Sequence, residues 1–339
     1  MKILIIRRDN IGDLILTTPL ISMLAKDHQV DMLVNSYNKL VLRENPCVNK
    51  IHYYTKSHHE GSYLTKILVF LRRIKTTLDV WKEGYDVAIV AGNWNKRQLH
   101  WARLSRAKRV IAVGDDAPDI VTDKLPYMNA LHMVEQLAQL ARPLGCETLP
   151  GKLEIFMTEA EIEQAAKTII NPRRMPIYGL QISSRKEKQR WPIDNFVELA
   201  HKLSRREVCK IVLFWSPGSS DNLTHPGDDE NSKIIMSQCK DINIVPYSTK
   251  NIRELMAGMI LCDQIITSDG GALHMAAGVG KPVVALFGNS EPSVWGPWKV
   301  PSRVLESSSR DVTTISIDEV FRNFIELRNE VVNKHYVGE

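Results

Sequence analysis

The sequence lacks any apolar run of the roughly 18–20 residues that a helix needs to cross a bilayer. Near its start, a run of four apolar residues, Ile3 to Ile6, precedes two arginines, whereas a secretory signal has an apolar core of about 7–15 residues. Hydrophobic residues make up 44% of the chain and charged residues 24%, as in globular proteins with a sizeable core. We therefore expect a cytoplasmic protein that is soluble or peripheral to a membrane.

The five cysteines, at positions 47, 146, 209, 239 and 262, include no CxxC pair. An odd number without regular spacing predicts reduced thiols rather than a disulfide framework or a zinc site. The histidines of HYYTKSHHE (52–60) have no second cluster at ligand spacing, so we expect a surface loop there and no metal ion. The net charge of +5 comes without a helix-turn-helix, zinc or RNA-binding signature, which argues against a nucleic-acid partner.

Neither GxGxxG nor GxxxxGK[ST] occurs in the chain, which argues against an NAD-dependent oxidoreductase and against a P-loop NTPase. What the chain does have is short apolar runs that alternate with helical patterns, which predict βαβ units around buried parallel sheets. The expected strands are 2–8, 30–35, 85–91, 109–114, 177–182, 210–215, 264–269 and 282–288. The expected helices are 13–27, 63–82, 129–142, 158–169, 194–206, 251–262 and 270–279.

Two prolines in NPRRMP (171–176) indicate a linker between two α/β domains, each doubly wound and Rossmann-like. We expect an N-terminal domain over 1–170 and a C-terminal domain over 177–315, which face each other across a cleft at the carboxyl ends of their strands. A last helical segment, 316–339, could lean back across the linker to the N-terminal domain.

The loop RDNIGD (8–13) follows the first expected strand and precedes a helix. Gly12 permits a tight turn, and Asp13 falls at the helix N-terminus, where a carboxylate stabilises the helix. A carboxylate at the carboxyl end of a strand can also act as a general base towards a substrate. The residues alone leave both interpretations open.

The stretch TSDGGALHMAAG (267–278) predicts a strand, a tight polar turn and a helix. Gly270 and Gly271 leave amide N–H groups bare at the helix start, where a phosphate can bind, and His274 follows one turn later. The alternative is a helix that Asp269 caps and whose histidine is packed in the core. The acids at 228–230 are expected to be solvated.

A third loop, in QISSRKEKQRWPIDNF (181–196), gathers hydroxyl and cationic side chains behind another expected strand. Such groups can hold a diphosphate, although a solvated loop ahead of a helix is also consistent with them. They are Ser183, Ser184, Arg185, Lys186, Lys188 and Arg190.

Three segments together resemble the heptosyltransferases, glycosyltransferase family 9, over nearly the whole chain. They are MKILIIRRDNIGDLILTTPLI at the start, SSRKEKQRWP in the middle, and TSDGGALHMAAGVGKPVVALFGNSEPSVWGP near the end. The resemblance implies a GT-B fold and an inverting, metal-independent transfer of heptose from ADP-heptose to an inner-core sugar of lipopolysaccharide. The nucleotide sugar is then a substrate, no cofactor is needed, and the acceptor lies at the inner face of the inner membrane.

The resemblance also assigns roles to individual residues. Asp13, in the Gly12–Asp13 pair, matches the catalytic base. Asp269, Gly270, Gly271 and His274 match the D-x-G-x-x-H segment that binds the donor diphosphate, and Ser183 and Ser184 match a hydroxyl pair that touches phosphate. Many members have lysine where this chain has Gln189, so either Lys188 or Arg190 would supply that cation. Many also have a ribose-binding glutamate in the loop that here reads WSPGSSDN (215–222), where the nearest acid is Asp221.

Two further stretches are basic or amphipathic. In NWNKRQLHWARLSRAKR (93–109), Arg97, His100, Arg103 and Arg106 are spaced to share a helix face, which is either solvated or a seat for an acidic acceptor. The apolar face of 63–81 predicts a helix packed on the core, with a membrane-surface role as the alternative. For the whole chain, the alternatives to heptose transfer are a transferase with another nucleotide sugar, an NAD-dependent oxidoreductase, and a non-enzymatic nucleotide-sugar sensor.

Overall fold

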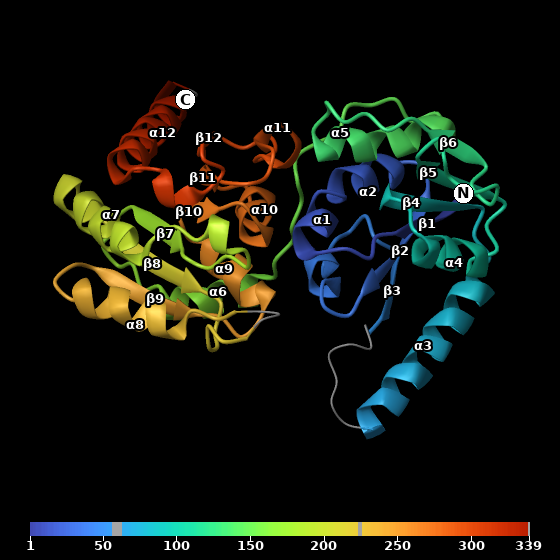
Figure 1. Cartoon of the computed structure of the whole chain (residues 1–339), viewed down its shortest axis with the longest axis horizontal. Helices are drawn as coiled ribbons and strands as arrows, with labels where there is room; N and C mark the ends of the chain where they lie inside the picture. Colours follow the sequence, from blue (N-terminus) through green and yellow to red (C-terminus); the bar gives the residue numbers. More distant parts are fainter. Residues whose placement is uncertain (56–62, 223–225, 338–339) are drawn as a thin grey trace. The chain divides into compact units, whose positions relative to one another are not determined.

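The computed structural model describes residues 1–55, 63–222 and 226–337, which form two compact units, Met1–Phe156 and Met157–Glu339 (Figure 1). The boundary lies one helix earlier than the linker composition predicted. Helix α6 (Glu159–Thr168) belongs to the second unit because it packs against α9 (Ile252–Ile260) of that unit. The expected surface loop with His58 and His59 lies outside the described residues.

The first unit is a parallel six-stranded sheet in the order β3-β2-β1-β4-β5-β6. Its strands are β1 (Lys2–Ile6), β2 (Gln29–Asn35), β3 (Lys50–Tyr54), β4 (Val87–Asn93), β5 (Arg109–Val113) and β6 (Asp123–Leu125). Its helices are α1 (Ile11–Ile15), α2 (Thr18–Leu24), α3 (Tyr63–Glu83), α4 (Lys96–Leu104) and α5 (Met133–Ala138), with short 3-10 turns η1 (Lys39–Leu42) and η3 (Gln139–Leu144). The central strands are buried except at one end of each, as their continuous apolar runs require.

The second unit repeats this architecture, with the strand order β12-β11-β10-β7-β8-β9 and every pair parallel. Its strands are β7 (Ile177–Gln181), β8 (Lys210–Trp215), β9 (Ile244–Ser248), β10 (Gln264–Ser268), β11 (Val283–Phe287) and β12 (Ser302–Glu306). Besides α6 and α9 it has α7 (Ile193–Arg206), α8 (Asp229–Gln238), α10 (Gly271–Gly278), α11 (Pro292–Trp295), α12 (Ile317–Val337), η4 (Glu187–Gln189) and η5 (Val312–Thr314). The last helix, α12, packs on α7, β11 and β12 of this unit.

The expected α/β class and all eight expected strands are confirmed. The four strands that the sequence did not indicate, β3, β6, β9 and β12, are the edge strands of the two sheets. An edge strand has one neighbour and is partly solvated, so it needs no continuous apolar run. The expected helix 13–27 is divided into α1 and α2, and Pro19 stands in the first turn of α2, where its missing N–H removes no helical hydrogen bond.

The strand order fixes where each sheet can bind a ligand. In the first sheet the chain moves outward from β1 to β3 and then returns to lay β4 on the other side of β1. In the second sheet β7 and β10 are the equivalent neighbours. Loops leave such a pair of strands in opposite directions, and the space outside their carboxyl ends is the usual ligand site of this topology.

His52 lies in β3 rather than in a surface loop. It is buried, and its Nε2 is 2.8 Å from the hydroxyl of Tyr85, which donates to Asp31 Oδ2 at 2.8 Å. Asn49 donates to the other oxygen of Asp31 at 2.7 Å. Burial lowers the pKa of His52 below its usual value near 6.5, which favours the neutral ring in this polar cluster of the core.

An ion pair holds α6 on the second unit. Glu161 of α6 accepts hydrogen bonds from Arg253 of α9, whose guanidinium is buried. Replacing Glu161 with glutamine removes the negative charge that faces the buried guanidinium of Arg253, and because Glu161 itself is partly exposed we expect the unfolding free energy to fall by about 2 kcal/mol. That corresponds to a lowering of the thermal midpoint by roughly 4–8 °C. Glu163→Gln, an exposed position on the same helix, is the control and should leave the midpoint unchanged.

The ion pair also determines how the difference in thermal midpoint between wild type and Glu161→Gln depends on pH. The hydrogen bond from Arg253 lowers the pKa of Glu161 from 4.5 to about 2. The folded state therefore keeps this carboxylate charged at pH values where the unfolded chain protonates it. Thermal midpoints of wild type and Glu161→Gln should differ fully above about pH 5 and converge as the pH falls towards 2. An unchanged difference down to pH 3 would contradict the role of the ion pair.

Candidate active site

Asp13 lies where the first expected loop placed it, in the first turn of α1 directly after β1. One carboxylate oxygen accepts a hydrogen bond from Nη2 of Arg7 at 3.1 Å, and the other accepts one from the backbone N–H of Asn10 at 2.9 Å. Its side chain is 16% exposed. A carboxylate has about four acceptor positions, so this one is fixed in place and still has capacity to accept a proton from a substrate hydroxyl.

Arg7, which the motif reasoning did not single out, fixes this carboxylate. It is 2% exposed, and it contacts Asp9 at 3.3 Å besides Asp13. Its Nη1 donates at 2.6 Å to the carbonyl of Ala91, at a break in the register between β4 and β5. A Cβ at Gly92 would lie 1.8 Å from that Nη1, so only glycine leaves room for the arginine. In the sequence, the feature that could have indicated Arg7 is a charged residue placed directly after a buried apolar strand.

Two asparagines, one at the end of β2 and one directly before η1, fix the rest of the loop. Asn35 donates to the carbonyls of Arg8 and Asp9 at 3.1 and 3.0 Å, and Asn38 donates to the carbonyl of Asp9 at 3.2 Å. Both asparagines are buried. The loop after β1 is therefore held by side chains at and just beyond the end of the neighbouring strand β2, which gives the rigidity that a positioned catalytic group needs.

The basic segment forms helix α4, on which Arg97, His100 and Arg103 are exposed at three-residue steps. Arg106 lies beyond the end of the helix, so it does not continue this face as expected, and its guanidinium stands 5.1 Å from the ring of Trp81. Arg109 pairs with Asp123. The cations available to an acidic ligand on α4 are therefore fewer than the sequence suggested.

In the second unit, loops after three neighbouring strands meet at Asp269. Gln189, from the loop after β7, donates to Asp269 Oδ2 at 2.8 Å. Ser290, from the loop after β11, donates to the same oxygen at 2.5 Å. Gln189 also accepts from the hydroxyl of Ser184 at 3.3 Å. Asp269 thus links the three loops to one another. Ser290 contributes to this link, and the sequence analysis did not predict it.

Gly270 and Gly271 stand at the start of α10, as predicted. Gly270 has φ of 151° and is the residue before the helix, a conformation that residues with a Cβ rarely adopt. The first amide groups of α10 have no carbonyl partners within the helix, and they carry the positive end of its dipole. His274 is the fourth residue of α10 and is 4% exposed.

The two serines and two cations predicted in the loop after β7 differ from one another in their contacts and exposure. Ser183 accepts a hydrogen bond from the backbone N–H of Ser216 at 2.7 Å, which ties this loop to the end of β8. Lys188 is exposed. Arg190 instead donates to Asp228 at 2.9 Å, and this pair favours Lys188 as the cation for a diphosphate.

The expectation that the acids at 228–230 are solvated is wrong for Asp228, which is 3% exposed and accepts from both Arg190 and Asn231. Asp229 accepts from the indole of Trp215 at 2.8 Å and from the backbone N–H of Gly218 at 3.0 Å, and the hydrogen bond from Trp215 lowers its pKa. The unpredicted helix α8 begins here. Most of the donors come from elsewhere in the chain, from Arg190, Trp215 and Gly218, and an acidic run in the sequence gives no sign of them.

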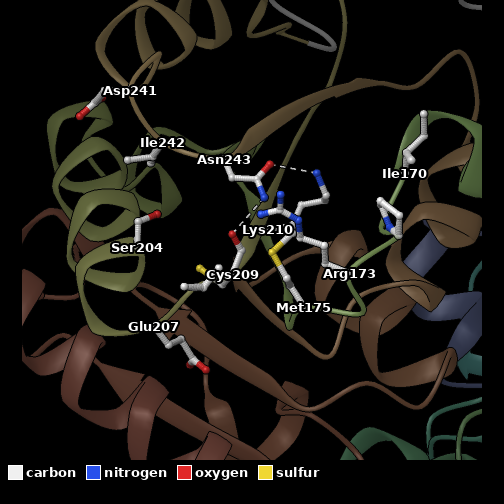
Figure 2. Close-up of a pocket in the computed structure, with 12 residues that line it drawn as sticks. Ile170, Arg173, Met175, Ser204, Glu207, Cys209, Lys210, Asp241, Ile242 and Asn243 are labelled. Carbon is white, nitrogen blue, oxygen red and sulfur yellow. Dashed lines mark hydrogen bonds between the residues drawn. The ribbon is translucent and has the colours of Figure 1, made fainter.

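A cavity of about 550 Å³ lies elsewhere in the second unit, at the amino ends of β7 and β8 (Figure 2). Figure 2 shows Asn243 joined by hydrogen bonds to Lys210 and to the carbonyl of Cys209. The cavity is lined partly by exposed apolar residues such as Ile170, and neither Asp269 nor His274 lines it. It is therefore separate from the loops at the carboxyl ends of the strands.

Comparison with known proteins identifies the family to which this chain belongs. The model of glycosyltransferase family 9 (heptosyltransferase) matches residues 75–322, well over half of the chain. The chain belongs to this family. It is accordingly a glycosyltransferase, and the oxidoreductase alternative is excluded. Lipopolysaccharide heptosyltransferase 3 of Escherichia coli K12 is 27% identical over 303 residues, which cover 85% of this chain and 82% of that protein.

Solved structures of the family share the fold. The glycosyl transferase family 9 protein from Veillonella parvula superposes with a TM-score of 0.79 at 21% identity, covering 97% of both chains. The ADP-heptose lipopolysaccharide heptosyltransferase II of E. coli superposes with a TM-score of 0.76 at 21% identity, covering 97% of this chain and 99% of that one. The expected two-domain GT-B fold is thereby confirmed.

Proposed function

We propose that this family 9 transferase moves heptose from ADP-heptose to an inner-core sugar of lipopolysaccharide, with inversion at the anomeric carbon and without a metal ion. The observation that carries the proposal is the carboxylate of Asp13, held by Arg7 and by a backbone N–H at the carboxyl end of β1. The comparisons support the donor and the acceptor, because related proteins are heptosyltransferases of lipopolysaccharide.

Asp13 acts as the general base in a single displacement. It takes the proton of the acceptor hydroxyl while that oxygen attacks the anomeric carbon of the donor. The new C–O bond forms on the face opposite the departing diphosphate, which leaves with the electron pair of the broken bond. Attack from the opposite face inverts the configuration at this carbon.

The donor diphosphate binds at the start of α10. The backbone N–H groups of Gly270 and Gly271 and the ring of His274 meet the negative charge that grows on the leaving group. Lys188, which is exposed, supplies a cation. Asp269 itself is bonded to Gln189 and Ser290, so it positions the glycine turn and does not touch phosphate.

Arg97 and Arg103 form an acceptor-side surface on α4. Both are exposed, and six positions along the helix place them about 120° apart on its outer side, with the exposed His100 between them. An anionic, lipid-linked acceptor is attracted to such a face. The protein would then work at the inner face of the inner membrane while remaining peripheral to it.

A transferase with a different nucleotide sugar is the second candidate, favoured by one observation. Gln189 occupies the position where many members carry lysine, and here its amide is buried and bonded to Asp269. A neutral side chain at this point changes the charge next to the nucleotide-sugar site.

The nucleotide is tested by thermal shift, with ADP, UDP, GDP, CMP and NAD each added without metal. A ligand at about 100 times its dissociation constant adds roughly 2.7 kcal/mol to the unfolding free energy and raises the midpoint by several degrees. We expect ADP alone to stabilise the protein and His274→Ala to weaken the effect. Turnover of ADP-heptose on a heptose-deficient core acceptor then tests the transfer itself.

The other outcomes are equally informative. A shift with UDP or GDP in place of ADP would establish the second candidate and overturn ADP-heptose as the donor. Stabilisation by ADP that is unaffected by His274→Ala would move the diphosphate away from α10. Binding of ADP-heptose without any transfer, in wild type and Asp13→Ala alike, would point to a nucleotide-sugar sensor.

A further inference from the structure

Helix α3 carries most of its large apolar side chains on the outside of the protein. The sequence-based prediction that this apolar face packs on the core is wrong. The face that packs contains Thr76 and Val80, and the hydroxyl of Thr76 donates to the carbonyl of Tyr53 in β3 at 2.7 Å. The exposed apolar residues are Ile67, Leu68, Phe70, Leu71, Ile74, Leu78 and Trp81.

These residues form a continuous stripe. At 100° per residue, all of them except Leu68 fall within an arc of about 100° that lies nearly opposite Thr76 and Val80. Phe70 is 62% exposed and Leu71 54% exposed. The stripe consists of Ile67, Phe70, Leu71, Ile74, Leu78 and Trp81. Figure 1 shows α3 projecting from the first unit, with its amino-terminal half clear of the sheet.

Cations border the stripe on both sides. Lys75 and Lys82 follow one edge, Lys66 and Arg73 follow the other, and all four are exposed. The sequence has no acidic residue from 66 to 78. Arg106, just beyond α4, places its guanidinium 5.1 Å from the ring of Trp81 at the end of the stripe. The apolar surface is thus framed by positive charge.

We propose that α3 docks the protein on an anionic lipid bilayer, with the stripe in the headgroup region and the bordering cations at the phosphates. An apolar face flanked by lysine and arginine is the pattern of a helix that lies in the plane of a membrane surface. In the described part of the chain, no helix is long and apolar enough to span a membrane. A second copy of this chain fits less well, because its lysines would meet those of the first.

Membrane docking is a property separate from the transfer reaction, and it can be measured without any turnover. The full-length protein is floated with vesicles of phosphatidylcholine alone or with about 30% phosphatidylglycerol. We expect binding to the anionic vesicles, binding at least ten-fold weaker to the neutral ones, and loss of at least ten-fold in Phe70→Ser/Leu71→Ser. The control is Leu149→Ser/Val208→Ser, which removes two apolar residues that are 87% and 75% exposed and should bind as wild type does.

The charges are tested in the same assay. Lys75→Glu/Lys82→Glu should lose at least ten-fold in binding, whereas Lys152→Glu/Lys167→Glu, an equal charge change elsewhere on the surface, should lose far less. Thermal midpoints confirm that each variant is folded, and ADP binding should not change. Wild-type binding that α3 variants leave intact, or no vesicle binding at all, overturns the proposal. A dimer by light scattering that Phe70→Ser/Leu71→Ser converts to monomer, without vesicle binding, would assign the stripe to a second copy instead.

Discussion

Replacing Asp13 with asparagine is expected to slow sugar transfer by about 10²–10⁴-fold while ADP still binds as it does to wild type. Asparagine is close in size to aspartate but cannot take the proton of the acceptor hydroxyl. Both groups that contact this carboxylate, Nη2 of Arg7 and the N–H of Asn10, are donors, so the amide nitrogen must oppose one of them. Some loss of stability is therefore expected, about 1–3 kcal/mol.

The measurement is turnover of ADP-heptose at saturating donor, with ADP binding followed by thermal shift on the same samples. Asp9→Asn is the matched control, because Asp9 is the other carboxylate that contacts Arg7 and it is 39% exposed. Its turnover should stay within a few-fold of wild type. Equal losses in both variants would mean that the arginine cluster as a whole, rather than the base Asp13, determines the rate. Full turnover in Asp13→Asn would remove the general-base assignment.

Two substitutions of Asp269 are expected to have opposite outcomes for the donor. In Asp269→Ala both Gln189 and Ser290 lose their common acceptor, so the loops after β7 and β11 lose their link to the loop after β10, and ADP should bind at least ten-fold more weakly. In Asp269→Asn an amide oxygen can occupy the position of Oδ2 and accept both hydrogen bonds. We expect ADP binding within about three-fold of wild type, since the negative charge itself has no favourable role next to a diphosphate.

Titration calorimetry with ADP, together with the thermal midpoint without ligand, separates the two effects. Ser290→Ala is an intermediate case that removes one of the two hydrogen bonds and should weaken ADP binding by a smaller factor than Asp269→Ala. Weak binding in Asp269→Asn would show that the carboxylate charge itself acts on ligand binding. Undiminished binding in Asp269→Ala would place the diphosphate elsewhere.

The site was predictable as far as it consists of local motifs. Asp13 after a strand, and the glycine pair ahead of α10, are strand-to-helix turns whose geometry is set by neighbours in the sequence. The residues that form hydrogen bonds with these groups could not be predicted from the sequence. Arg7 reaches Ala91, 84 residues away, because β1 lies beside β4, and Gln189 reaches Asp269, 80 residues away, because β7 lies beside β10. Contacts at such separations leave no pattern in a single sequence.

By itself the sequence determined the α/β class, the central strands, most helices and the turns that expose Asp13 and the amides of α10. These follow from hydrophobic periodicity, from glycine and from helix-start residues, all of which act over a few positions. Only the tertiary structure decided the strand order, the edge strands, the burial of Arg7 and Asp228, and the exposure of the apolar face of α3. Whether an apolar stripe is covered depends on what packs against it, and periodicity is the same on a buried helix and on an exposed one.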